Sequence, residues 1–167
     1  SHTIVGALAG DAITTGTVNT IVGYTAGTNL ETGSENVIIG SAAMNSANGS
    51  ESRNVAIGVN ALEDMNSDEN NQNVAVGYRA AANLTTGTQN TALGSEAIGD
   101  GVVTGDHNTA LGAGAGKSIT SGAQNTLIGS LAGDALGAGA YNVAVGVNAL
   151  GAEDSGSGNV AIGRKAL

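Results

Sequence analysis

The chain has 167 residues, of which 28 are Gly and only 2% are aromatic, and it contains no Cys, Pro, Phe or Trp. So few large side chains predict a thin interior of Ala, Val, Ile, Leu and Gly, and the lack of Cys excludes disulfides and Cys-ligated metal sites. The net charge of −9, with 5 Lys and Arg, argues against nucleic acid as a partner, because a phosphate-binding surface needs many cations.

A repeat of 17 to 19 residues runs through the whole chain. Its consensus is N-[TV]-[AI]-[IVL]-G-x-x-A-x-x-x-[ILM]-x-x-G-x-x, and the first Gly of the consensus serves as an anchor. The ten anchor glycines are Gly6, Gly23, Gly40, Gly58, Gly77, Gly94, Gly112, Gly129, Gly146 and Gly163. The longer copies carry their extra residues after the Ala of the consensus, which marks a surface loop there. We therefore predict one repeat domain, 1–167, of ten coils.

Each repeat contains one predicted strand, in the pentad that ends at the anchor glycine. The pentads are rich in β-branched residues and contain no Asp, Glu, Lys or Arg. In chain order they span 2–6, 19–23, 36–40, 54–58, 73–77, 90–94, 108–112, 125–129, 142–146 and 159–163. One short strand per repeat predicts an all-β parallel β-solenoid, or β-roll, whose coils stack at about 4.8 Å into a rod on the order of 50 Å long.

An asparagine begins nearly every pentad, and His2 takes its place in the first copy. Equivalent residues lie above one another in a solenoid, so their amides can bond along the axis as a ladder. The predicted ladder comprises Asn19, Asn36, Asn54, Asn73, Asn90, Asn108, Asn125, Asn142 and Asn159.

Both faces of each predicted strand are apolar, which is typical of strands that are buried on both sides. The residues one and three before the anchor, such as Val143 and Val145, share one face, and we expect it to fill the coil interior. The residue two before the anchor is mostly Ala, and we expect that face to meet other chains at a symmetry axis. The axis candidates are Ala56, Ala75, Ala92, Ala110, Ala144 and Ala161.

The chain ends show no departure from the repeat. A solenoid without caps exposes strand edges, so we expect a piece of a longer fibre. Ser1 and His2 are interpreted as a vector scar. No run of 18 apolar residues occurs, so we expect no membrane insertion in this segment.

The pentads Asn54-Val-Ala-Ile-Gly58 and Asn159-Val-Ala-Ile-Gly163 resemble the head repeat of YadA-like trimeric autotransporter adhesins. The fuller unit, with Asn90-Thr-Ala-Leu-Gly94 after Leu84-Thr-Thr-Gly87, is similar to repeats of phage tail fibres and other large surface proteins. The resemblance covers all ten repeats, although this repeat is longer than the usual adhesin head repeat. It implies an intertwined or side-by-side homotrimer of left-handed parallel β-rolls, extracellular on a bacterial surface or virion. Its role would be attachment to a host or that of a spacer. The choice between adhesin and tail fibre stays open.

No catalytic, cofactor or metal site is predicted. The segment 112–118 looks like a phosphate-binding loop, but Leu111 stands where the motif requires Gly. The acidic stretch 63–69 lacks the spacing of a calcium loop and is expected to be a solvated loop. Tyr24 and Tyr78, each directly after an anchor glycine, are candidate contacts for a host-surface protein or glycan receptor.

Two other functions are weighed against the fibre. A single-chain solenoid could bind ice or a polysaccharide through a regular threonine array, but we place the pentad threonines inside the coil. They are Thr3, Thr20, Thr91, Thr109 and Thr126. An acyltransferase-type helix would need three hexapeptide-like segments per coil, whereas the only such segment in each coil is the one exemplified by residues 5–9.

Overall fold

The computed structural model describes residues 1–47, 49–67, 70–152 and 155–167, and in these ranges it contains ten strands joined by turns and no helix. Each strand occupies the middle three residues of one predicted pentad. The strands are β1 (Thr3–Val5), β2 (Thr20–Val22), β3 (Val37–Ile39), β4 (Val55–Ile57), β5 (Val74–Val76), β6 (Thr91–Leu93), β7 (Thr109–Leu111), β8 (Thr126–Ile128), β9 (Val143–Val145) and β10 (Val160–Ile162).

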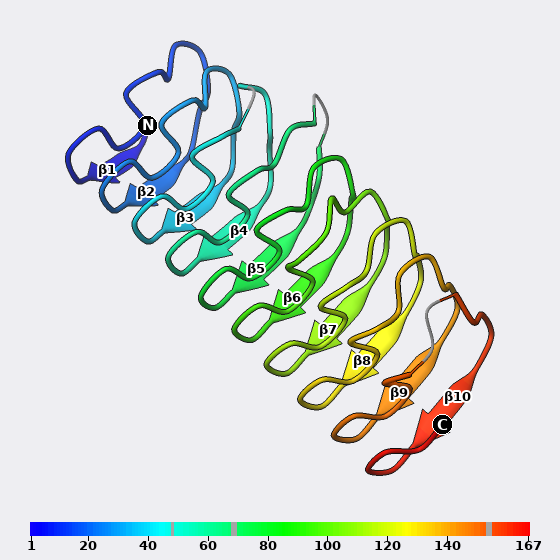
Figure 1. Ribbon diagram of the computed structural model, residues 1–167. Helices are drawn as coiled ribbons and strands as arrows, with labels where there is room; N and C mark the ends of the chain where they lie inside the picture. Colours follow the sequence, from blue (N-terminus) through cyan, green and yellow to red (C-terminus); the bar gives the residue numbers. More distant parts are fainter. Residues whose placement is uncertain (48, 68–69, 153–154) are drawn as a thin grey trace.

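The ten strands form one parallel sheet whose strand order is the order of the sequence. Neighbouring strands pair with equivalent residues side by side, for example Val74 with Thr91 and Val76 with Leu93. Figure 1 shows the coils stacked along one axis, with the sheet along one side and β1 and β10 at opposite ends of the stack. The predicted all-β parallel β-solenoid, with one strand per repeat, is confirmed.

Each strand ends at its anchor glycine, where φ lies between 123° and 143°. L-residues rarely adopt this conformation. The stacking adds a second constraint, because a Cβ built on Gly112 would lie 2.5 Å from the carbonyl oxygen of Gly129 in the next coil. Backbone conformation and close approach of the coils therefore both restrict the anchor column to glycine, except at Gly163, where only the backbone conformation does so.

The interior of each coil is a single layer of side chains. In the eighth repeat it contains Leu127 from the strand, Ala132 from the following turn and Leu136 from the opposite wall, all without solvent exposure. The small Ala132 faces the two large leucines, so the side chains fill the interior of the coil without any aromatic residue. This explains how a chain with so few large residues forms a continuous core.

The corners of the coils hold many L-residues in the left-handed conformation. In the eighth repeat these are Gln124, with φ of 57°, and Leu131, with φ of 56°, and equivalent positions in most other repeats do the same. The β-branched Val18 adopts it too, with φ of 58°. Each such residue costs about 1 kcal/mol, so the stacking interactions must offset a repeated backbone strain.

Candidate interaction surface and internal ladders

The residue two before each anchor glycine points into its own coil. The alanines expected at an inter-chain axis are buried in the core of their own chain, so that assignment is wrong. Ala56, Ala75, Ala92, Ala110, Ala144 and Ala161 all have 2% exposure or less. The physical reason is the asparagine two residues earlier on the same face, because a buried amide finds its hydrogen-bond partners only inside the coil.

The opposite face of the sheet is the outer one, and we call it the strand face. It comprises the residues one and three before each anchor: Thr3, Val5, Thr20, Val22, Val37, Ile39, Val55, Ile57, Val74, Val76, Thr91, Leu93, Thr109, Leu111, Thr126, Ile128, Val143, Val145, Val160 and Ile162. All of them are exposed or half-buried, and Leu111 is 42% exposed. The expected interior position of the five threonines is therefore also wrong.

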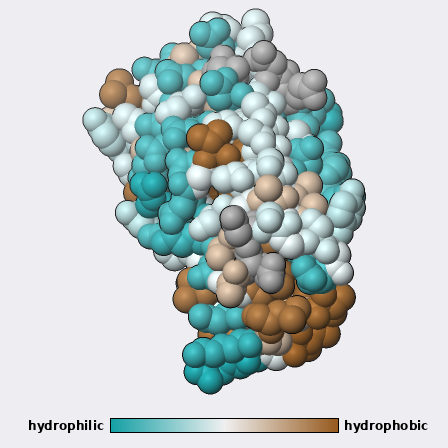
Figure 2. All heavy atoms as spheres, turned by 45° about the vertical axis from the view of Figure 1, so that its right-hand side comes forward, coloured by the Kyte–Doolittle hydropathy of each residue, from teal (hydrophilic) through white to brown (hydrophobic). Residues whose placement is uncertain are grey.

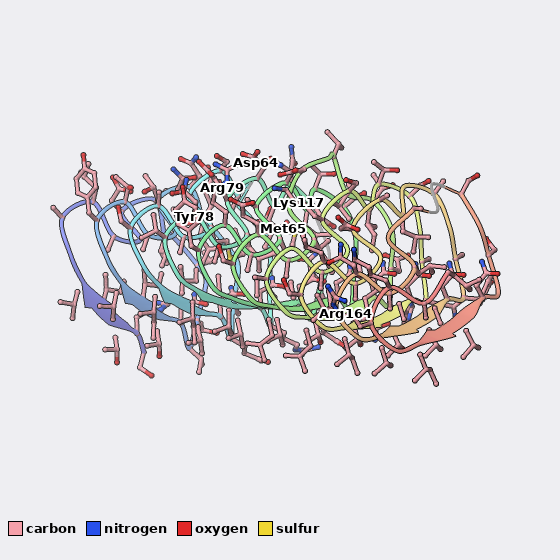
Figure 3. The ribbon with its side chains drawn as sticks, turned by 60° about the horizontal axis from the view of Figure 1, so that its bottom comes forward. Asp64, Met65, Tyr78, Arg79, Lys117 and Arg164 are labelled. Carbon is pink, nitrogen blue, oxygen red and sulfur yellow. The ribbon has the colours of Figure 1, made fainter. Side chains whose placement is uncertain are left out.

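The strand face is apolar apart from threonine hydroxyls and carries no charge. Figure 3 shows a row of short side chains that projects from the strands, away from the interior of the coils. In Figure 2, apolar side chains gather at the lower end of the visible surface, the end where β10 lies in Figure 1, while polar side chains cover much of the rest. The sheet therefore has a packed inner face and an unpartnered outer face.

The buried asparagines form a hydrogen-bonded ladder along the axis. Asn108 illustrates one rung: its Nδ2 donates to Asn90 Oδ1 at 3.1 Å and to the Gly122 carbonyl oxygen at 2.9 Å. Its Oδ1 accepts from the backbone N–H of Asn125 at 3.1 Å and from Asn125 Nδ2 at 3.0 Å. The rung thus joins three successive coils. At the first coil, His2 Nδ1 accepts from the Asn19 backbone N–H at 3.4 Å.

The ladder changes where the repeat is longest. Asn54 Nδ2 donates to Ser52 O at 3.2 Å and to Asn71 Oδ1 at 3.4 Å, instead of to a backbone carbonyl of the next coil. In the same region Glu51 replaces a repeated glycine, is fully buried, and accepts from the backbone N–H of Gly49 at 3.1 Å and of Ser67 at 3.4 Å. Glu51 and Asn71 were not predicted as partners in this region, although the break in the glycine column is visible in the sequence.

A second column of polar side chains, which was not predicted either, accepts hydrogen bonds from the preceding coil, whereas the asparagines of the ladder accept them from the following coil. Ser34 Oγ accepts from the Thr17 backbone N–H at 2.9 Å, and Asp106 Oδ1 accepts from the Thr88 backbone N–H at 2.7 Å. These residues lie six before an anchor, where Ser, Thr and Asp recur in the sequence. The column satisfies loop N–H groups that face the following coil.

One ion-pair cluster links two coils on the surface. Lys117 Nζ lies 2.7 Å from Glu96 Oε2 and 3.3 Å from Asp100 Oδ2. The hydrogen bond from Lys117 lowers the pKa of Glu96, and the hydrogen bonds to Glu96 and Asp100 raise the pKa of Lys117. Because all three side chains are about a third exposed or more, the cluster contributes little to stability.

The candidate receptor tyrosines lie on the surface, with Tyr24 60% exposed and Tyr78 54% exposed, three repeats apart. Of the acidic stretch, Asp68 and Glu69 lie outside the described residues. Within the described ranges no three His, Cys, Asp or Glu residues are grouped to hold a metal ion, and no pocket is found. The same ranges contain no helix long and apolar enough to cross a membrane.

Comparisons of the chain with protein-family models, with curated proteins and with solved structures give no match.

Proposed function

We propose that the chain is a segment of a homotrimeric fibre in which the strand faces of three left-handed solenoids meet. The fibre would lie outside the cell, on a bacterial surface or a virion, and would mediate or support attachment to a host surface. The resemblance of the pentads to trimeric adhesin heads and phage tail fibres supports this setting.

The observation that carries the proposal is the uncharged, apolar strand face. Parallel sheets are ordinarily covered on both faces, whereas here only the inner face is packed. The strand face contributes 15 Val, Ile and Leu residues per chain. Covering half-exposed side chains of this kind is worth about 1 kcal/mol each, which gives a gross gain on the order of 10 kcal/mol per chain. That gain is comparable with the cost of association.

The narrowness of the strand face supports three chains rather than many. A three-residue strand is roughly 10 Å long, so three such faces enclose a triangular space that their own side chains can fill. Larger rings would leave a hole lined by aliphatic side chains. The shape of the strand face and the resemblance to trimeric adhesins therefore both support three chains.

Two lysine substitutions at neighbouring positions test the proposal. Leu111→Lys places a charge on the strand face, while Ala110→Lys places one in the core, where Ala110 has no solvent exposure. We expect Leu111→Lys to give folded single chains and Ala110→Lys to unfold the chain, by light scattering coupled to gel filtration and by circular dichroism. Leu111→Lys protein that stays trimeric, or wild-type protein that is a single chain, would overturn the proposal.

The outward threonines favour a second candidate function, a single-chain solenoid that binds ice or a flat polysaccharide. Thr91, Thr109 and Thr126 lie side by side in three successive strands and face outward. A thermal-hysteresis assay distinguishes the two functions, because a buried strand face in a trimer cannot bind ice. We expect no hysteresis.

A further inference from the structure

Two exposed columns border the strand face, one at each end of the strands. The first rim is the residue five before each anchor glycine, and the second rim is the residue directly after the anchor. Every member of the first rim is exposed, and so is every member of the second except the half-buried Ser41. The two rims lie six residues apart, roughly 20 Å along the chain.

The rims are complementary in size within each coil. Six coils carry a long side chain in the first rim: Glu35, Arg53, Gln89, His107, Gln124 and Tyr141. In the second rim of those same six coils stand only Ser, Val or Ala. The last coil reverses the pattern, with Gly158 in the first rim and Arg164 in the second. Gln72 and Tyr78, both long, are an exception.

The charged residues of the rims are not opposed by like charges. Arg53 and Glu35, both in the first rim, form an ion pair along the axis, with Arg53 Nε 2.9 Å from Glu35 Oε2. The second rim carries one charge, on Arg164, and its coil has Gly158 in the first rim.

Within one chain the rims stand on opposite sides of the strand face. First-rim side chains bond to one another along the axis, as Gln89 Nε2 does to Gln72 Oε1 at 3.3 Å, but these bonds do not explain why the two rims are complementary in size. This complementarity becomes useful when the first rim of one chain meets the second rim of another.

The symmetry of a ring produces this meeting. In a cyclic trimer each contact is head-to-tail, so the start of a strand in one chain lies beside the end of a strand in the next. A two-fold axis along the strands, which makes the two solenoids antiparallel, would instead bring like rims together, whereas any rotation axis parallel to the fibre brings unlike rims together. Resting on the proposed function, we propose that the corners of the trimer are formed by the first rim of each chain against the second rim of its neighbour, coil for coil without axial offset.

Cysteine cross-linking tests this arrangement, and the absence of native Cys gives a clean background. Gln124 and Ser130 are the two rim positions of one coil, and both are exposed. They are too far apart for a bond within a chain, because a disulfide requires Cα atoms within about 7 Å. We expect Gln124→Cys/Ser130→Cys protein to run as a covalent trimer on a non-reducing gel and as a single chain after reduction.

Three controls make the outcome specific. Gln124→Cys alone and Ser130→Cys alone should remain single chains on the gel, and so should Gln124→Cys/Ser95→Cys, which pairs rims two coils apart. Covalent dimers from either single variant, efficient cross-linking of the offset pair, or a wild-type trimer whose double variant does not cross-link would each overturn the rim pairing. Wild-type protein that is a single chain by light scattering would instead refute the proposed function.

Discussion

Removing one rung of the asparagine ladder should destabilise the protein far more in the middle of the solenoid than at β10. In Asn108→Ala the chain loses two donated and two accepted hydrogen bonds, all between 2.9 and 3.1 Å. The Gly122 carbonyl and the Asn125 backbone N–H then remain buried without these partners. At about 1 kcal/mol per bond, with a further penalty for the orphaned groups, the loss in unfolding free energy is about 3–5 kcal/mol per chain.

Asn159→Ala is the matched control. Asn159 is half-buried, and among the described residues its side chain makes one bond, from Nδ2 to Asn142 Oδ1 at 3.1 Å. The expected loss is about 1 kcal/mol. Urea denaturation of both variants at the same protein concentration, followed by circular dichroism, measures the difference. Equal destabilisation by the two substitutions would show that the ladder does not stabilise the coils as argued.

Two other predictions follow from close packing and from charge. Gly105→Ala should prevent stable folding, because its Cβ would collide with the Gly122 carbonyl oxygen. Gly158→Ala should cost only about 1 kcal/mol, because a Cβ there meets no atom of the described residues within 4 Å. Thermal melts that are alike for the two variants would contradict this. Because the pKa of Glu96 is lowered in the folded chain, the pairing of Glu96 with Lys117 stabilises the fold at pH values above 4.5, the ordinary pKa of Glu. This stabilisation is lost as the pH falls through the lower folded-state pKa. Because the pKa of Lys117 is raised, the same stabilisation is fully present below pH 10.5, the ordinary pKa of Lys, and is lost as the pH rises through the higher folded-state pKa. Lys117→Met should therefore be less stable than wild type at pH 7, and this deficit should shrink as the pH falls below 4.5; a deficit that does not change with pH would refute the assignment.

The strands and the coil count were predictable because the repeat is strict. A pentad that ends in glycine every 17 to 19 residues leaves little choice besides a stack of equivalent strands. The assignment of the two strand faces failed for a physical reason: a period of two says which residues share a face but not which face is inside. Ala110 and Leu111 are both apolar, so hydrophobicity could not separate them.

The polar residue of the pentad held the missing information. Asn108 lies on the same side of the strand as Ala110, and its amide needs buried partners, which fixes that side as the interior. The irregular coils were harder to predict. Glu51 is a carboxylate in a buried column, and the bonds that it accepts from Gly49 and Ser67 depend on loop conformations that the repeat does not specify.

The most direct test of the account is the mass of the wild-type chain in solution. Light scattering of the purified protein over a range of concentrations should give three times the chain mass of 16.0 kDa. The apolar strand face would then be covered by identical neighbours. A mass of one chain at every concentration, with the fold intact by circular dichroism, would contradict the account, because the strand face would then be exposed to water.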